Sequence, residues 1–364
     1  MLKRLVNEAR FTLAIETTGP VLVKAGHASL DGRDMEPVRT FRNGSWQVYL
    51  PGSSLKGVVR SHLEKVVRSL NATPGVVCNP FLLLRGTKMR REGDALYCDS
   101  YPDVFCGDKF EIRKRTSYDA CGRRWQRSAQ DLDTTTAYAD SCSVCRIFGS
   151  TSFVGRVSIS DAYLTTASDV REEFRDGVGI DRLTGGAAHG AKFDLAAVPS
   201  GVRFEAGVVL RNFECWQLGA LLLIVQDLAD GLIRVGSGRS RGFGGVRGWI
   251  VSDSSQHDGS GLLGLEIHYF GSSEPPDSGK VVGLGKFLTG DSYGTRPDDE
   301  LAVASEAEPR RRGIRHVTTY TGGALEQLTQ DAIAAFVQRI QDWQVPAGMT
   351  WESLRWQPVH GGAP

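Results

Sequence analysis

Three absences narrow the class of protein before any motif is considered. The longest apolar run, Leu218–Val225, is far too short to cross a membrane, and the N-terminus lacks the apolar core of a signal peptide. Net charge is also nearly absent, because 43 Lys and Arg residues balance 42 Asp and Glu residues. We therefore expect a cytoplasmic protein, in which any surface that binds nucleic acid must be a local basic cluster.

Standard nucleotide-binding motifs are missing as well. The glycine-rich stretch Gly236–Gly245 is not followed by Gly-Lys-Ser/Thr, and it lacks the dinucleotide-binding spacing. Segment 73–141 has little apolar periodicity, so we do not expect it to bury a core by itself. It holds four of the seven cysteines, which in the cytosol are reduced thiols or metal ligands more often than disulfides.

What the chain does contain is a mixture of strand and helix patterns, which predicts an α+β fold. Strands are expected at Phe11–Glu16, Trp46–Leu50, Val157–Tyr163, Phe204–Leu210, Val246–Val251 and Leu262–Phe270. Helices are expected at Ser53–Leu70, Trp216–Leu228 and Leu325–Trp343, and an extended hairpin at Val178–Ser200.

The helix after Pro51 carries apolar residues on one face and basic residues on the other. Ser53 or Ser54 is expected to cap it, which would gather hydroxyls and free N–H groups at the positive end of the helix dipole. With Lys56 one turn in, this is a suitable seat for a phosphate. Taken alone, a capped amphipathic helix with a solvated basic face explains the same pattern.

Two further stretches suggest chemistry. Cys142-x-x-Cys145 has the spacing of half a tetrahedral zinc site, and a metal would hold the segment that lacks a core. Two buried thiols are the alternative. In Gly236–Gly245 the glycines let the backbone approach a ligand, and the arginines between them offer bidentate phosphate contacts. A tight hairpin with solvated arginines explains this loop nearly as well.

The order of these motifs resembles that of one known family. The motifs are an Asp-bearing first loop, YLPGSSLKGVVR, CSVCRIFGS, VSISDAYL, GIDRLTGGAAHGAKFDLAAVPSG and VGSGRSRGFGGV. Together, over about residues 10–250, they are similar to the RAMP superfamily of CRISPR systems, and more narrowly to the repeated backbone subunit of type III effector complexes. The resemblance implies an RRM-like, ferredoxin-like palm over 1–252. A zinc-binding insertion (about 73–150) and a thumb hairpin (about 178–200) would interrupt the palm, and residues 253–364 would form a C-terminal extension of unclear role.

The resemblance also assigns roles to residues. Guide RNA would be gripped by Ser53, Ser54, Lys56, Arg60, Gly238, Arg239, Ser240 and Arg241. The thumb would offer Leu183, His189 and Phe193 as wedges between base pairs. The structural zinc would be held by Cys78, Cys121, Cys142 and Cys145, with Cys106 as the substitute for Cys121 and Cys98 not excluded.

Cleaving members of the family carry an Asp before a Pro-Val pair in the first loop, a context that Asp34 matches better than Asp31. Asp34 would help cut target RNA with Mg²⁺ or Mn²⁺, within the assembled complex only. The implied partners are guide CRISPR RNA, complementary target RNA and other effector subunits. Two alternatives remain open: a non-catalytic capping or adaptor subunit, and a zinc-stabilised protein that binds a nucleotide or another phosphate ligand.

Overall fold

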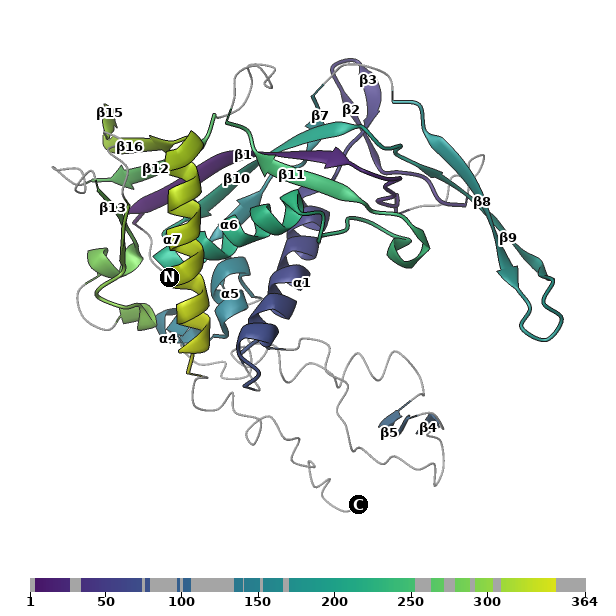
Figure 1. Ribbon diagram of the computed structural model, residues 1–364, viewed down its shortest axis with the longest axis horizontal. Helices are drawn as coiled ribbons and strands as arrows, with labels where there is room; N and C mark the ends of the chain where they lie inside the picture. The colour runs from purple at the N-terminus through teal and green to yellow at the C-terminus, as the bar shows by residue number, and fades with distance from the viewer. Residues whose placement is uncertain are drawn as a thin grey trace.

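The computed structural model describes residues 4–26, 34–73, 76–78, 97–98, 101–105, 134–139, 141–150, 153–165, 170–252, 263–271, 279–288, 292–303 and 309–344. In this part of the chain, one antiparallel sheet organises the molecule (Figure 1). Its strands, in spatial order, are β15 (Arg310–Arg312), β16 (Arg315–Tyr320), β12 (Leu265–Phe270), β1 (Asn7–Thr17), β10 (Arg203–Arg211) and β6 (Val157–Ile159). In addition, β11 (Val246–Ile250) pairs with β1, and β7 (Tyr163–Leu164) pairs with β10.

The central strand is β1, and its alternating pattern explains why. Phe11, Leu13 and Ile15 point to one face, where they meet Val208, Ala206 and Phe204 of β10 in register. The other edge of β1 is shared, because β12 pairs with its N-terminal half and β11 with its C-terminal half. A strand paired on both edges along its length is the natural centre of a sheet.

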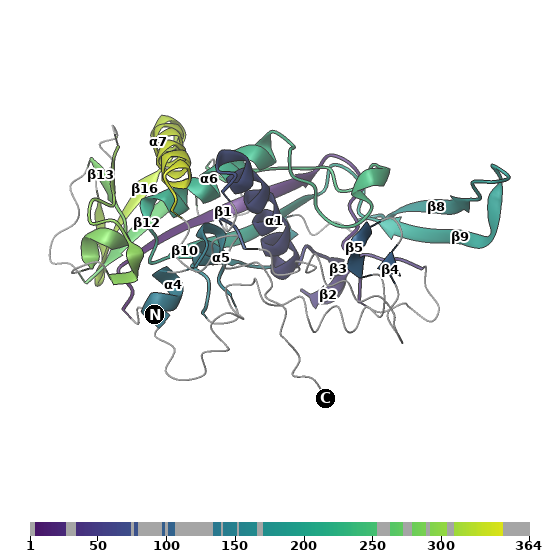
Figure 2. The same cartoon turned by 90° about the horizontal axis from the view of Figure 1, so that it is seen from below.

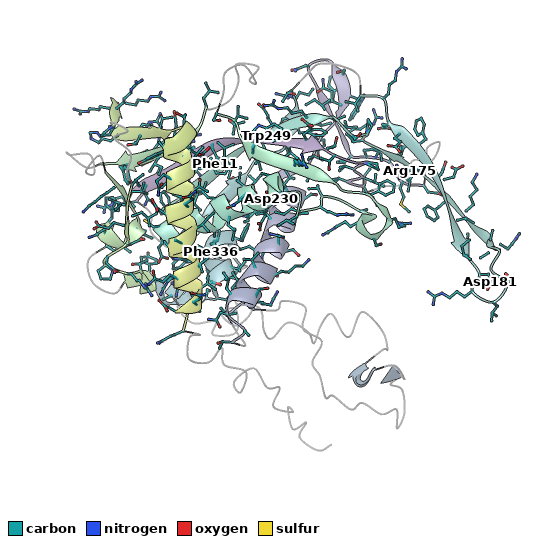
Figure 3. The ribbon with its side chains drawn as sticks, in the orientation of Figure 1. Phe11, Arg175, Asp181, Asp230, Trp249 and Phe336 are labelled. Atoms are coloured by element: carbon teal, nitrogen blue, oxygen red, sulfur yellow. The ribbon has the colours of Figure 1, made fainter. Side chains whose placement is uncertain are left out.

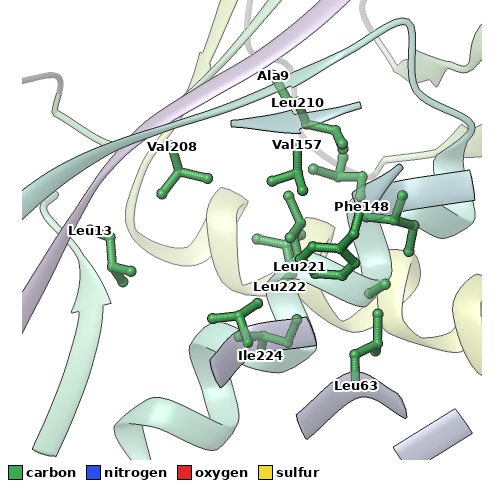
Figure 4. Close-up of a cluster of buried hydrophobic side chains, with 14 of the residues drawn as sticks. Ala9, Leu13, Leu63, Phe148, Val157, Val208, Leu210, Leu221, Leu222 and Ile224 are labelled. Carbon is green, nitrogen blue, oxygen red and sulfur yellow. The ribbon is translucent and has the colours of Figure 1, made fainter. Parts of the chain in front are cut away.

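Helices cover the apolar face of this sheet. They are α1 (Gly52–Leu70), α5 (Ser143–Phe148), α6 (Cys215–Ala229) and α7 (Gly322–Gln341). Figure 4 shows side chains from three of them, including Leu63 of α1, Phe148 of α5 and Leu221 of α6, which belong to the same buried cluster as Val157 and Leu210 of the sheet. Leu63 is fully buried, and cutting such a side chain back to alanine typically costs about 2–5 kcal/mol.

The order of these elements along the chain defines the fold. The sequence β1–α1–β6–β10–α6–β11 places its strands in the order β11–β1–β10–β6, all antiparallel. This is the βαββαβ arrangement of a ferredoxin-like sheet. The predicted α+β class is therefore confirmed.

Helix α1 begins one residue earlier than predicted, and the expected serine cap is wrong. Pro51 is the N-cap residue, no side chain caps the helix from that position, and Ser53 and Ser54 lie inside the first turn. The Gly52 N–H donates instead to Asp161 Oδ1, at 2.8 Å. A carboxylate at the positive end of the helix dipole is favourable. Asp161, a residue distant in sequence, therefore caps the helix in place of the serines.

Residues after 252 join the same sheet and the same core. Strands β12 and β16 extend the sheet beyond β1, and α7 lies along α6 with Leu328, Ala332 and Phe336 buried. The buried Asp299 ties this part to the start of α6, because its Oδ1 accepts a hydrogen bond from the Cys215 N–H at 2.9 Å. The division at residue 252 stays a prediction, whereas the attachment of 263–344 to the palm sheet is observed.

Smaller elements complete the described chain. They are β2 (Arg39–Arg42), β3 (Ser45–Val48), β4 (Tyr97–Cys98), β5 (Tyr101–Phe105), α4 (Thr134–Ala139), β13 (Lys280–Val282), β14 (Glu300–Ala302) and the 3₁₀ turns Leu284–Phe287 and Ser292–Gly294. Among the described helices, none has the length and apolar character needed to span a bilayer.

Candidate functional site

A long β-hairpin projects from one end of the molecule in both ribbon views (Figures 1 and 2). Its strands are β8 (Glu173–Ile180) and β9 (Ala187–Ala197), so it begins at Glu173 rather than at the predicted residue 178. Its tip is well braced, since Asp181 accepts hydrogen bonds from the Leu183 N–H at 3.0 Å and the Thr184 hydroxyl at 2.9 Å. These bonds lower the pKa of Asp181, which Figure 3 labels at the tip.

The three expected wedge residues are placed differently along this hairpin. Leu183, at the tip, is 96% exposed, and His189 is also exposed. Phe193 lies at the base, where its ring fills the space beside Gly177: a Cβ at that glycine would stand 2.2 Å from the ring. The Arg241 guanidinium lies 5.4 Å from the centre of the same ring. Two of the three side chains are thus exposed, and the third is used for packing.

The first loop runs along the base of the hairpin. Asp31 lies outside the described residues, but Asp34 is described and exposed. Its N–H donates to Asp194 Oδ1 at 3.2 Å, and its own Oδ2 accepts from the Asp194 N–H at 3.1 Å. The Met35 carbonyl then accepts from the Ala196 N–H at 2.9 Å. The candidate cleavage residue is therefore fastened to β9 by two hydrogen bonds of its own, and the next residue adds a third.

The glycine-rich loop is joined at its base by a backbone bridge, and its tip is exposed. Arg234 and Gly245 form the bridge, and Gly238 and Gly242, both at positive φ, flank the single 3₁₀ turn Arg239–Arg241. Gly236 has to be glycine, because its φ is +87° and a Cβ would stand 2.4 Å from the Leu22 carbonyl oxygen. The side chains of Arg239, Ser240 and Arg241 are exposed.

A second, smaller apolar cluster joins these three segments. It consists of Leu22, Leu195, Ala197 and Phe243, with Met35 and Phe193 packed against it. Met35 comes from the first loop, Leu195 from the hairpin and Phe243 from the glycine loop, so segments more than 40 residues apart share one core. Arg175 of the hairpin also lies over the Phe243 ring, at 5.1 Å. This cluster fixes Asp34, the hairpin and the arginine turn relative to one another.

The basic face of α1 is engaged within the protein. The Lys56 ammonium donates to the Val157 carbonyl at 3.1 Å, and burial together with Arg60 lowers its pKa. Arg60 donates to the Gly149 carbonyl at 3.2 Å and to Cys145 Sγ at 3.3 Å. Burial alone would lower the pKa of Arg60, but Cys145, Glu64 and Cys78 raise it above its ordinary value. Among the four residues assigned to this helix, Ser53 is exposed and Ser54 half-buried.

Three cysteines meet beneath this helix and can hold a metal ion such as zinc. The Sγ atoms of Cys78, Cys142 and Cys145 all lie within 4.8 Å of one another, and all three residues are buried. The Cys78–Cys145 separation is 3.5 Å, close to the ~3.8 Å edge of a tetrahedron built on Zn–S bonds of about 2.3 Å. Cys142 also accepts a hydrogen bond from the Cys145 N–H at 3.4 Å, as the N-cap of α5.

The fourth expected ligand cannot be placed in this cluster. Cys121 and its substitute Cys106 both lie outside the described residues, and Cys98 lies in β4. Cys215, the remaining cysteine, is buried at the start of α6, where its thiol donates to the Val281 carbonyl at 3.5 Å. The donor set of three clustered, buried sulfurs is the feature that suits zinc, because soft thiolates are its preferred structural ligands.

Comparison with known proteins agrees with this architecture. The family model of the RAMP superfamily matches residues 14–247, which is more than half of the chain. The chain therefore belongs to the RAMP superfamily, and the resemblance seen in the sequence is confirmed. Membership supports a role in CRISPR-associated RNA binding. No curated protein gives a significant match to the chain.

Sequence reasoning missed two residues that organise these sites. Asp161 caps α1 and Asp194 holds Asp34; both lie in motifs that carry the family resemblance, but nothing in those motifs indicates these roles. Each acts on a partner more than 100 residues away, so no local spacing could have revealed it.

Proposed function

We propose that this chain is a guide-RNA-binding backbone subunit of a type III CRISPR ribonucleoprotein effector, which holds the guide–target duplex and cleaves target RNA through Asp34. The observation that carries the proposal is the second apolar cluster, which joins the first loop, the hairpin and the glycine loop. Three segments that the family uses on RNA are thereby held as one unit. Such a complex would act in the cytoplasm.

The guide would be held by its sugar-phosphate backbone. The exposed Arg239 and Arg241 can each form bidentate contacts with a phosphate, and Gly238 and Ser240 leave room for the strand to approach. At the start of α1, Ser53, Ser54 and Lys56 would add further contacts. Arg60 would have to leave Cys145 and Gly149 to join them. Phosphate contacts position the guide, while base pairing supplies the specificity.

The hairpin is the candidate thumb. Its exposed tip residue Leu183 and the exposed His189 would push between base pairs of the guide–target duplex and displace one nucleotide. Because Phe193 is packed at the base under Arg241, it would brace the thumb instead of inserting. The Asp181 bonds at the tip would keep the inserted end in one conformation.

Cleavage would take place at the displaced nucleotide, beside Asp34. Among the described residues, Oδ1 of Asp34 has no hydrogen-bond partner, so it is available to hold a divalent ion, Mg²⁺ or Mn²⁺. That ion would supply charge stabilisation for the developing phosphorane oxygens. The 2′-oxygen would lose its proton and attack the adjacent phosphorus, and the 5′-oxygen would leave with a proton. The products are a 2′,3′-cyclic phosphate and a 5′-hydroxyl end.

The cysteine cluster would hold a structural zinc ion, with Cys78, Cys142 and Cys145 as three ligands and Cys121 as the fourth. Zinc at this place would pin residues 76–78 and α5 beneath α1. Arg60, through its bond to Cys145, would orient one ligand, as partners of metal ligands commonly do.

Reconstitution of the effector complex tests the proposal. The wild-type complex should contain a short guide RNA and cut complementary RNA at regular intervals, and Asp34→Ala should abolish cutting with assembly intact. Cutting by Asp34→Ala at the wild-type rate would contradict the catalytic role. Assembly without cutting by the wild type would indicate a capping or adaptor subunit. A purified chain that carries zinc and binds a nucleotide but never RNA would point to the alternative of a phosphate-ligand protein.

A further inference from the structure

We propose that Asp194 on the thumb strand β9 is the positioning residue for Asp34, acting through its carboxylate oxygen as the acceptor for the Asp34 N–H. The inference rests on the proposed function, because it deepens the role of the same site. It assigns no direct contact between Asp194 and RNA.

The hydrogen bonds between the two residues are reciprocal. The Asp34 N–H donates to Asp194 Oδ1 at 3.2 Å, and the Asp194 N–H donates to Asp34 Oδ2 at 3.1 Å. One bond fixes the Asp34 backbone and the other fixes its carboxylate, so both the position and the orientation of the side chain are set. If either bond were lost, the Asp34 carboxylate would no longer be held in both position and orientation.

The described part of the first loop that follows Asp34 reinforces this geometry. Downstream of Asp34, the Met35 carbonyl accepts from the Ala196 N–H, Met35 packs in the second apolar cluster, and Val38 donates to the Val23 carbonyl at 2.9 Å. Asp194 supplies the side-chain contact at Asp34 itself, next to these bonds. The residue that would cut RNA thus depends on the thumb for its placement.

A consequence follows for coupling between the thumb and cleavage. Asp194 lies in the same strand as His189 and only five residues from it, and β9 leads directly to the tip. Movement of the hairpin when it inserts into a duplex would carry Asp194 with it. Asp34 would therefore be aligned by the same element that displaces the target nucleotide, and a small misplacement of a reacting group can cost a large factor in rate.

The variant pair Asp194→Ala and Asp194→Asn separates the acceptor from the charge. Alanine removes the acceptor, whereas asparagine keeps an oxygen at the same place without the charge. Loss of one hydrogen bond of about 1 kcal/mol corresponds to about fivefold in rate. We expect Asp194→Ala to slow single-turnover target cleavage at least about fivefold and Asp194→Asn to restore it to within about twofold, at saturating Mg²⁺. The spacing of the products and the affinity for target RNA should not change.

Asp176 provides a matched control on the same hairpin. It lies directly across from Asp194 in the β8–β9 register, is exposed, and pairs with Lys192 at 3.4 Å instead of with the first loop. Asp176→Ala should therefore cleave at the wild-type rate. An equal loss in Asp176→Ala would assign the effect to the hairpin's charge or folding and overturn the inference.

Two other results would also overturn it. The first is cleavage by Asp194→Ala at the wild-type rate. The second is a fall in the cleavage rate of Asp194→Asn that is as large as the fall in Asp194→Ala. The failure of the proposed function looks different, because Asp34→Ala would then cleave normally. When Asp34→Ala is inactive and Asp194→Ala is normal, only the positioning role fails.

Discussion

The close contact between α6 and α7 makes one substitution unusually informative. Gly219 lies in the interior of α6, and a Cβ built there would stand 1.8 Å from the carbonyl oxygen of Ala332 in α7 and 3.0 Å from the Cβ of Phe336. Real Cβ contacts are not shorter than 3.0 Å, so Gly219→Ala has to push the α7 backbone away by about 3.0 − 1.8 = 1.2 Å. The obstacle is backbone, which cannot swing aside as a side chain can.

Two opposing effects set the change in the free energy of unfolding that Gly219→Ala should cause. In a helix interior, replacing glycine by alanine contributes about 0.8–1 kcal/mol of stability through propensity alone. Forcing an extra carbon into a packed core costs about 1–3 kcal/mol, and here the side chains buried between the helices, Leu328 and Phe336, would separate as well. We expect Gly219→Ala to lower the free energy of unfolding by about 1–2 kcal/mol.

Gly57 is the matched control for this experiment. It is also a helix-interior glycine, in α1, but it is exposed, and nothing lies within 4 Å of a Cβ built there. Gly57→Ala should therefore gain the propensity contribution alone and raise the free energy of unfolding by about 0.8–1 kcal/mol. The same replacement of glycine by alanine should thus destabilise the protein in α6 and stabilise it in α1.

Urea denaturation followed by tryptophan fluorescence is a suitable assay. Trp216, at the start of α6, and Trp343, just past the end of α7, form an edge-to-face pair with ring centres 5.5 Å apart, so their emission reports on the docking of α7. Destabilisation in Gly219→Ala should appear as a lower midpoint at an unchanged slope. Equal stabilisation by the two substitutions would refute the packing of α7 on α6 at this distance.

Two further predictions concern the cysteine cluster and a buried carboxyl group. Cys142→Ser should lower bound zinc, measured by elemental analysis, from about one equivalent to well below it, because it removes one of three clustered sulfurs; wild-type metal content would show that these sulfurs are not the ligands. Burial and the nearby Glu214 raise the pKa of Asp299 to about 7 from an ordinary value of 3.8. Since the folded state holds this proton more tightly, the stability it contributes is complete below about pH 4 and is lost as the pH rises through 7. The melting temperature of the wild type should therefore fall from pH 5 to 8 by more than that of Asp299→Asn. Parallel profiles of melting temperature against pH would contradict this assignment.

Local patterns were enough to predict much of the fold. The apolar period of α1, with Leu55, Val59, Leu63 and Val67 all buried, shows directly in the spacing of the residues. The alternation in β1 and the apolar runs of α6 and α7 were likewise visible. The Cys142-x-x-Cys145 spacing also anticipated a metal-ligand cluster, because two ligands within one turn depend on local geometry only.

Long-range contacts account for what was missed. The serine cap failed because Asp161, from the loop after β6, reaches the helix start first. Phe193, a predicted wedge, packs beside Gly177 and Arg241, and Arg60, a predicted phosphate ligand, donates a hydrogen bond to Cys145; sequence spacing indicates neither contact. In each case the competing partner lies outside the few neighbouring residues on which a local pattern depends.

Sequence patterns alone were enough to predict the main strands and helices of the palm, the family, and the types of residue available for binding phosphate and metal. This was possible because periodicity and motif spacing depend on neighbours within a few residues. Only the tertiary structure decided that the first loop, the hairpin and the glycine loop share one apolar cluster and that Asp34 is held by Asp194. Those contacts join residues far apart in the chain, and they exist only once the sheet has brought the segments together.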